Sequence, residues 1–195
     1  KLDAIPKYHL SNLTREYMAD DSEILRQESL TRLSSLLESI DGAKVTLIGD
    51  TMLDRYHHGF ANNLNSTAPV PVLKILDSDE SPGASAHIAI GLTSFGMDVS
   101  FHTAIGDDIE SKSIISTLKS MDVRSENIIQ VKDRSTLTKI RFFGSRESLL
   151  DRSQILLQAD RGPNEPLETS VSDSLIESAR SNIPDSCALV ISDYD

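Results

Sequence analysis

The sequence has little positive charge, few aromatic residues and a single cysteine. Its 195 residues include 19 Lys and Arg against 30 Asp and Glu, which gives a formal net charge of −11. Because phosphate contacts need a basic surface, this balance argues against a nucleic-acid partner. The lone Cys187 excludes an internal disulfide and favours a reducing, cytoplasmic location. Since Cys187 precedes an apolar run, we expect it to be a buried small hydrophobe.

Other absences exclude whole classes of site. No run approaches the ~18 apolar residues of a membrane span, so we expect no membrane partner. The glycine patterns of Rossmann sites and P-loops are missing, as are the His-Glu-x-x-His and Gly-x-Ser-x-Gly motifs. The histidines show no metal-ligand spacing, and the adjacent His57 and His58 would point to opposite sides of a strand. We therefore expect no metal held by side chains of this chain.

Apolar periodicity predicts strands alternating with helices over most of the chain. This alternation favours an α/β sheet covered by helices. Leu30, Leu33 and Leu37 recur at helical spacing, and we interpret them as core residues rather than as a stripe that binds a partner. The predicted strands are 44–50, 98–105, 127–131, 137–143, 155–157 and 188–192, and the predicted helices are 22–40, 83–95, 110–121 and 168–182.

Two segments, near 57–76 and 137–157, do not fit this alternation. Within the first, Pro71 confines the apolar run 70–76 to a sheet edge or a strand start. Residues 77–82 are charged and are expected to form a turn. We therefore predict a small separate sheet that projects from the main one.

Two carboxylates follow the first predicted strand, in Gly49-Asp-Thr-Met-Leu-Asp-Arg-Tyr56. Ligands of open α/β sheets bind outside the carboxyl ends of strands, which places Asp50 and Asp54 where a polar ligand would bind. Carboxylates there can accept hydrogen bonds from sugar hydroxyls. An alternative is that Asp50 caps a helix and Asp54 pairs with Arg55 on the surface. The residues alone leave both interpretations open.

Several segments, in this order along the chain, resemble the PfkB/ribokinase family of carbohydrate kinases. Within that family the resemblance is greatest to the heptose-7-phosphate kinase domain of bifunctional heptose kinase/adenylyltransferases. It spans roughly residues 42–195, the amino-terminal half of the kinase fold. The segments are Gly49 to Tyr56, Ala68-Pro-Val-Pro-Val-Leu-Lys74, Pro82-Gly-Ala-Ser-Ala-His-Ile-Ala89, Ser94-Phe-Gly96 to Ile105-Gly-Asp-Asp108, Thr138-Lys-Ile-Arg141 and Val190-Ile-Ser-Asp-Tyr194.

The resemblance implies an α/β fold, a ribokinase-like three-layer α/β/α sandwich with a small β-sheet lid, incomplete at the C-terminus. The lid segments would lie near 57–76 and 137–157, and residues 1–41 would form an arm with an amphipathic helix. The implied activity is transfer of a phosphoryl group from ATP, with Mg²⁺, to a sugar or a sugar phosphate. Pairing of lids between two subunits would make the protein a homodimer.

The resemblance also assigns substrate-binding residues. Asp54 matches the carboxylate that binds sugar hydroxyls, and Asp50 belongs to the same motif. Gly83 matches the first of two family glycines, where a bare backbone lets the sugar approach closely. His87 stands where the family has asparagine. The second glycine is Ala84 here.

On the expected lid, Lys139 and Arg141 match a Lys and an Arg that could reach the phosphate of the substrate. Asp193 matches the aspartate near the region of phosphoryl transfer. A family arginine is replaced by Gln158. The departures at Ala84, His87 and Gln158 favour two alternatives: a non-catalytic sugar-binding or scaffold protein, or a PfkB kinase for another sugar or a nucleoside.

The family's catalytic aspartate lies in a Gly-Ala-Gly-Asp element that this sequence does not contain. The chain begins at Lys1 and stops at Asp195, directly after an apolar run. We therefore expect it to be part of a longer protein, whose catalytic aspartate lies beyond Asp195. These residues would supply the sugar-binding half and the lid, and would not act as a kinase alone.

Overall fold

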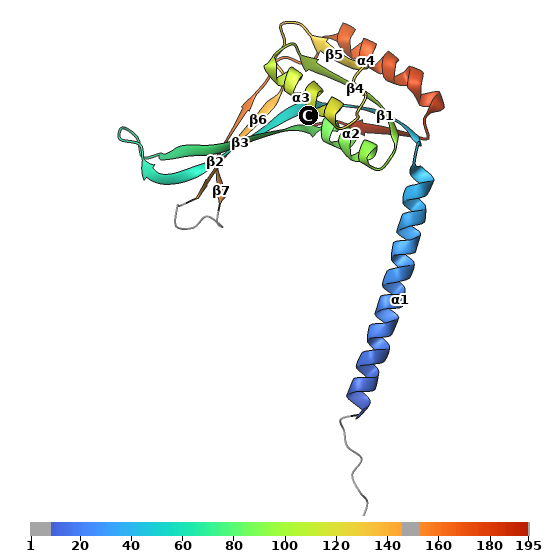
Figure 1. Cartoon of the computed structure of the whole chain (residues 1–195). Helices are drawn as coiled ribbons and strands as arrows, with labels where there is room; N and C mark the ends of the chain where they lie inside the picture. Colours follow the sequence, from blue (N-terminus) through green and yellow to red (C-terminus); the bar gives the residue numbers. More distant parts are fainter. Residues whose placement is uncertain (1–8, 146–152, 195) are drawn as a thin grey trace, which may run out of the picture. The chain divides into compact units, whose positions relative to one another are not determined.

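The computed structural model describes residues 9–145 and 153–194, which fall into two units, Lys1–Asp41 and Gly42–Asp195 (Figure 1). The first unit contains α1 (His9–Ile40), which begins well before the predicted helix 22–40. No helix among the described residues combines the length and the apolarity that crossing a bilayer requires.

The expectation that Leu30, Leu33 and Leu37 are core residues is wrong. Their exposed fractions are 50%, 52% and 39%. The physical reason is that α1 is the only element described in its unit, so it has no second layer within that unit against which to bury an apolar face.

The second unit is built on a parallel sheet of four strands. These are β1 (Lys44–Gly49), β4 (Asp98–Gly106), β5 (Ile128–Val131) and β8 (Ala188–Ser192), in the order β5-β4-β1-β8. The ends of each strand lie within two residues of a predicted strand, because each is a short apolar run.

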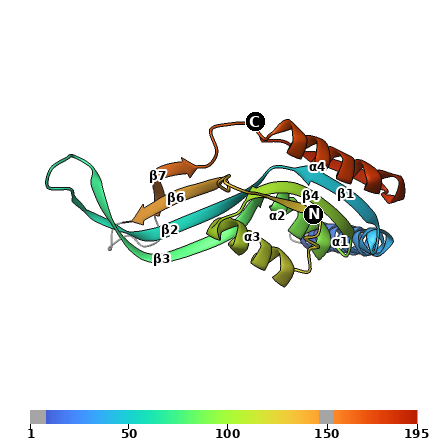
Figure 2. The same ribbon diagram turned by 90° about the horizontal axis from the view of Figure 1, so that it is seen from above.

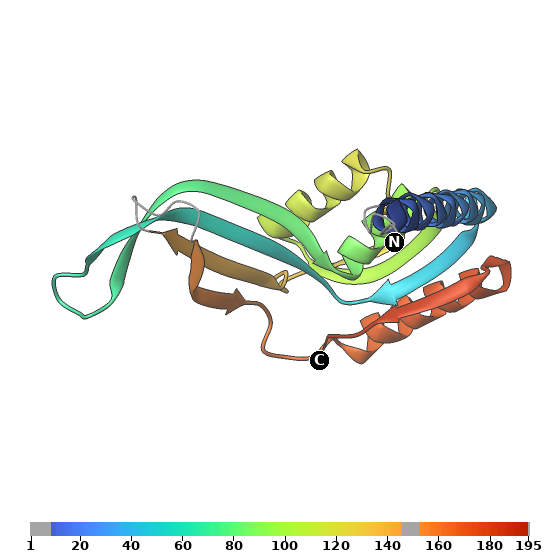
Figure 3. The ribbon, with the colours of Figure 1, turned by 90° about the horizontal axis from the view of Figure 1, so that it is seen from below.

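Three helices cover this sheet. Helices α2 (Ser85–Ser94) and α3 (Ile109–Ser120) lie on one face and α4 (Thr169–Asn182) on the other, as Figures 2 and 3 show from opposite sides. This is the expected three-layer arrangement. Buried side chains of β1, β4, α2 and α3, of the start of β2 and of the segment after α3 form the core: Leu47, Leu53, Ala86, Ala89, Val99, Phe101, Ile114, Leu118 and Val123.

Cys187 is exposed, so its prediction as a buried hydrophobe is wrong. It precedes β8, which lies at the edge of the described sheet and leaves Leu189 and Ile191 exposed as well. The predicted strand is present, but only Val190 of its apolar side chains packs against the core, so this edge strand does not bury its neighbours.

A second sheet of four strands, in the order β3-β2-β6-β7, leaves the main one at the end of β1 (Figure 1). Its strands are β2 (Thr51–Leu64), β3 (Pro71–Ala84), β6 (Thr138–Ser145) and β7 (Gln154–Arg161). The pair β2/β6 is parallel, and β2/β3 and β6/β7 are antiparallel. The predicted separate sheet is therefore present, with Pro71 at the start of an edge strand.

The charged turn predicted at 77–82 is wrong, because these residues continue β3. Polar pairs across the hairpin explain why the strand runs through. Arg55 Nε donates to Glu80 Oε1 at 2.6 Å, and His57 Nδ1 lies 2.7 Å from Ser78 Oγ. Polar side chains that face each other on neighbouring strands stabilise a sheet. Residues 77–82 resemble a turn only when they are considered without the neighbouring strand. β3 also includes Gly83 and Ala84, so α2 begins two residues later than predicted.

Candidate functional site

Asp50 and Asp193 lie at the carboxyl ends of neighbouring parallel strands, β1 and β8. After β1 the sheet grows on one side through β4 and β5, and β8 is then added on the other side of β1. Such a reversal is where α/β sheets bind ligands. The Asp50 N–H donates to the Ser192 carbonyl at 3.0 Å, and Asp50 Oδ2 accepts a hydrogen bond from the Tyr194 N–H at 3.0 Å. The structure thus brings these two predicted residues together.

Two cavities open at this end of the sheet. One of about 360 Å³ is lined by both carboxylates, Asp50 and Asp193. The other, of about 510 Å³, is lined by Asp50, Thr51, Gly106 and residues 134–137 and 163–167, among others. The larger volume is in the range of pockets that enclose small ligands.

Arg134 lines both cavities, and the sequence analysis did not single it out. Its Nη1 donates to the carbonyl oxygens of Glu165 and Pro166, at 3.1 and 3.2 Å. These bonds hold the 163–167 segment against the rim of the larger cavity. A lone arginine in a loop carries no periodic or motif signal, so only the fold reveals its position.

A chain of buried hydroxyls fixes the backbone of Asp50. Thr103 Oγ1 donates to Thr51 Oγ1, which lies 2.9 Å from Ser85 Oγ, and Ser85 Oγ donates to the Asp50 carbonyl at 2.5 Å. These groups come from β4, β2 and the start of α2. The alternative in which Asp50 caps a helix is wrong, since Thr51 begins a strand.

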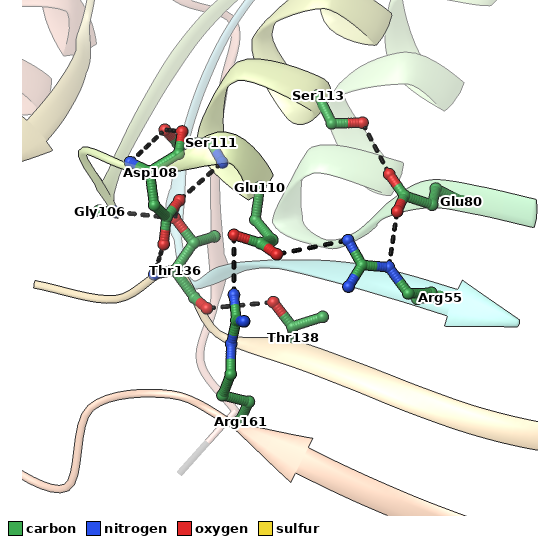
Figure 4. A network of polar contacts seen from close by, with 10 residues as sticks. All are labelled: Arg55, Glu80, Gly106, Asp108, Glu110, Ser111, Ser113, Thr136, Thr138 and Arg161. Carbon is green, nitrogen blue, oxygen red and sulfur yellow. Dashed lines mark hydrogen bonds and ion pairs between the residues drawn. The ribbon is translucent and has the colours of Figure 1, made fainter.

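Asp108 fixes a loop beside the larger cavity (Figure 4). It caps α3 by accepting from the Ser111 N–H, and its carboxylate also accepts from the N–H and the hydroxyl of Thr136, at 2.7 Å each. Burial by itself would raise the pKa of Asp108. The bonds from Thr136 and Ser111, together with the charge of Arg161, outweigh burial and lower that pKa.

A second group of candidates lies on one face of the second sheet. Arg141 Nη1 contacts Asp54 Oδ1 at 2.6 Å, Arg141 Nε donates to Gln158 Oε1 at 3.2 Å, and the guanidinium lies 5.5 Å from the centre of the Tyr56 ring. The hydrogen bond to Asp54 raises the pKa of Arg141 against the effect of burial. The alternative pairing of Asp54 with Arg55 is wrong, because consecutive residues of a strand point to opposite faces.

Gly83 and Lys139 lie beside this ion pair. A Cβ atom at Gly83 would collide with the Asp54 carboxylate, so that carboxylate lies directly against a bare backbone. Lys139 is the register partner of Asp54 on β2 and of Asp160 on β7. As alternate residues of β6, Lys139 and Arg141 share one face. The structure therefore brings Asp54, Gly83, Lys139 and Arg141 together.

His87 is not joined to this group. It is exposed in the first turn of α2, and among the described residues no hydrogen bond or ion pair links it to another candidate. Ala84 has a φ of 54°, a backbone conformation that L residues rarely adopt and glycine adopts readily. The backbone at Ala84 thus has the glycine-like geometry implied by the resemblance, although the residue is alanine.

Within the described residues, no cluster of three or more His, Cys, Asp or Glu side chains could hold a metal ion. Mg²⁺ in sites that bind nucleotides is usually held by one or two carboxylates together with substrate phosphates and water. Asp50 and Asp193, on the wall of one cavity, are donors of this kind.

Comparison with known proteins gives consistent results. No protein-family model matches the chain. It is 31% identical over 158 residues to the bifunctional protein HldE of Shewanella piezotolerans, and 34% identical over 154 residues to that of Actinobacillus pleuropneumoniae serotype 5b. These matches cover 81% and 79% of this chain but only 31% and 30% of the relatives. The chain thus spans about a third of the length of the curated relatives it matches.

Solved structures share the fold. Ribokinase from Giardia lamblia superimposes with a TM-score of 0.54 at 18% identity, over 76% of this chain and 44% of that one. Arabidopsis thaliana ribokinase, complexed with ribose and ATP, gives a TM-score of 0.53 at 12% identity, over 77% and 45%. The fold is therefore ribokinase-like, and the resemblance found in the sequence is confirmed: the chain is similar to part of the bifunctional HldE proteins and shares its fold with ribokinases.

Proposed function

We propose that this chain supplies the sugar-binding half and the lid of a kinase that transfers phosphate from ATP to a sugar phosphate resembling heptose 7-phosphate. The observation that carries the proposal is the Asp54–Arg141 ion pair set against the bare backbone of Gly83. It offers a carboxylate for hydroxyl groups and a cation for an anion within one small area, which is what a phosphorylated sugar requires.

Each residue of this group has a role that follows from its chemistry. The Asp54 carboxylate accepts hydrogen bonds from sugar hydroxyls, and Gly83 lets the sugar ring approach the backbone. The planar guanidinium of Arg141 retains donors beyond those that contact Asp54 and Gln158, and these can fork onto a phosphate. Lys139 adds a second positive charge on the same face of β6.

The implied cofactor is ATP with Mg²⁺. When bound, Mg²⁺ would neutralise charge on the transferring phosphoryl group, and Asp50 and Asp193 would be its carboxylate partners. The remaining task of the described residues is to orient the acceptor hydroxyl, because phosphoryl transfer depends mainly on positioning and charge neutralisation. Deprotonation of that hydroxyl is assigned to an aspartate outside these 195 residues.

The proposal includes a homodimer that pairs through the second sheet, in the cytoplasm. Its two edge strands, β3 and β7, present unpaired backbone groups that can pair with another chain. Large apolar side chains are exposed on the same strands, at the end of β2 and on the β2–β3 turn, a feature typical of interaction surfaces. They are Leu64, Val70, Val72, Ile75, Leu76, Ile155 and Leu157.

A second candidate function is sugar binding without phosphoryl transfer. It is favoured by the contact of Gln158 with Arg141, where the resemblance expects an arginine, because that contact occupies one donor of the guanidinium. A kinase for an unphosphorylated sugar or a nucleoside would also not need the cation at Arg141.

ATP consumption by the full-length protein, measured across sugars, sugar phosphates and nucleosides, separates these functions. We expect turnover with sugar phosphates, and loss of the preference for phosphorylated substrates in Arg141→Ala. The matched control is Arg124→Ala, which removes an exposed arginine paired with Asp98 on the main sheet. Folded protein that binds Mg-ATP but turns over none of these substrates would refute the kinase proposal.

A further inference from the structure

Glu110 is a buried carboxylate with no role in the proposed chemistry. Its side chain, in the first turn of α3, is only 4% exposed. Both oxygens contact arginines of the second sheet: Oε1 lies 3.3 Å from Arg55 Nη2, and Oε2 lies 2.7 Å from Arg161 Nη2 (Figure 4). A carboxylate is rarely buried unless it is paired in this way.

The two arginines come from strands that are not neighbours. Arg55 belongs to β2 and Arg161 ends β7, and β6 lies between them. Arg55 also contacts Glu80 of β3, whose Oε2 accepts a hydrogen bond from Ser113 Oγ at 3.0 Å. Two residues of α3 therefore connect three strands of the second sheet to a helix of the main one.

These contacts lie on the face opposite the candidate sugar site. Because side chains alternate along a strand, Arg55 faces α3 while its neighbours Asp54 and Tyr56 face the other way. The same alternation holds on β7, where Arg161 faces Glu110 and Asp160 is the register partner of Lys139. A shift of β2 away from α3 would therefore displace Asp54, and a shift of β7 would displace Asp160, the register partner of Lys139.

We propose that Glu110 is a positioning residue that holds the second sheet against the core and thereby fixes the Asp54–Arg141 face relative to Asp50 and Asp193. Its effect on sugar binding rests on the function proposed above, whereas its effect on the sheet does not. Loss of the charge on Glu110 removes the common partner of Arg55 and Arg161. The contact between Glu80 and Ser113 remains, but β2 and β7 lose their ion pairs to α3, and we expect the sheet to tilt about its junctions with β1 and α2.

The position of the sheet can be measured without any enzymatic activity. Cys187 is exposed and is the only cysteine of the 195 residues, so Thr67→Cys, in the exposed β2–β3 turn, creates one pair of labelling sites. Spin labels on the two cysteines report one narrow distance distribution if the sheet is held. We expect Glu110→Gln to broaden or shift this distribution.

The matched control is Glu177→Gln, which removes an exposed carboxylate paired with Arg180 within α4. It should leave the distances unchanged. A folded Glu110→Gln protein with the same distance distribution as its parent would overturn the proposal. If that variant does not fold, Arg161→Gln decides the question, because the Arg161 side chain is 52% exposed and can be replaced without opening the core. An unchanged distribution in Arg161→Gln would then count equally against the proposal.

The kinetic consequence separates positioning from general loss of structure. We expect Glu110→Gln to raise KM for the sugar phosphate about tenfold or more, because small displacements of binding groups have large effects. The KM for Mg-ATP should not change, and Arg161→Lys should keep wild-type values. If the full-length parent protein is folded and binds Mg-ATP but shows no kinase activity, the proposed function fails, while the distance measurement still tests the role of Glu110.

Discussion

Asp54 and Arg141, 87 positions apart in the sequence, meet through a contact of 2.6 Å between Oδ1 and Nη1. The contact depends on the parallel pairing of β2 with β6, in which Tyr56 and Arg141 are register partners. Each partner compensates the charge of the other while both stay partly accessible, with side-chain exposures of 17% and 21%. In the proposed function, Asp54 accepts hydrogen bonds from the sugar while Arg141 binds its phosphate.

Substitution of Asp54 tests this pair. We expect Asp54→Asn to lower the free energy of unfolding by about 1–2 kcal/mol, because it converts a charge-assisted hydrogen bond into an ordinary one. Denaturant unfolding measures the change. Asp79→Asn is the matched control, since Asp79 on β3 is exposed and has a 3.9 Å contact with His58. An equal loss in the two variants would contradict a special role for the Asp54–Arg141 contact.

The backbone at Ala84 gives a prediction in the opposite direction. Because its φ of 54° suits glycine, Ala84→Gly should raise the free energy of unfolding by about 1 kcal/mol through release of strain. Thermal or denaturant unfolding shows this directly. Ala86→Gly, inside α2 two residues later, should instead destabilise the protein by about 1 kcal/mol. Destabilisation by both substitutions would mean that Ala84 is not strained.

The cap of α3 predicts a large loss of stability. Asp108→Ala removes the bonds to Ser111 and Thr136, and we expect it to lower the free energy of unfolding by about 2 kcal/mol or more. Helix α4 supplies the control, because Glu168 stands at its N-cap without a side-chain capping bond. Glu168→Ala should therefore have little effect, and a comparable loss there would refute this account of Asp108.

The buried His102 predicts a dependence of stability on pH. Its two ring nitrogens contact Ser100 Oγ at 2.9 Å and Ser178 Oγ at 3.2 Å, and burial lowers its pKa. The unfolded chain, with a pKa near 6.5, therefore binds a proton more readily than the folded one. Stability should be full above about pH 6.5 and decrease as the pH falls below that value.

Unfolding measured between pH 7 and pH 5 checks this expectation. His102→Gln should flatten the dependence, whereas His87→Gln, at an exposed position, should keep the parent's slope. A slope that His102→Gln leaves unchanged would assign the dependence to other groups.

The main sheet could be predicted because its strands stand out as short apolar runs, and even the exposed edge strand 188–192 does so. The length of β3 could not, since residues 77–82 are acidic and are held in a strand by Arg55 and His57 of the neighbouring strand. Likewise the exposure of Cys187 could not be predicted, because it depends on which elements pack over β8, and the residues next to Cys187 do not show this.

The candidate site divides in the same way. Asp54, Gly83, Lys139 and Arg141 were identified by their motifs, and the fold brings them to one face. His87 was identified by the same reasoning and stays apart from them. Arg134 and Glu110 were missed, because each acquires its surroundings only when segments far apart in the sequence pack together.

Asp54 and Arg55 are neighbours in the chain, yet one faces the proposed sugar and the other faces α3. A mutational scan scored by sugar affinity would therefore return two interleaved sets of sensitive positions along β2 and β7. One set would consist of residues that contact the sugar. The other would consist of residues that contact α3, such as Arg55 and Arg161. Only substitutions in the second set should also change the distance between the spin labels at positions 67 and 187. A scan that measures both sugar affinity and this distance would therefore separate even positions, such as Asp54, from odd positions, such as Arg55 and Arg161.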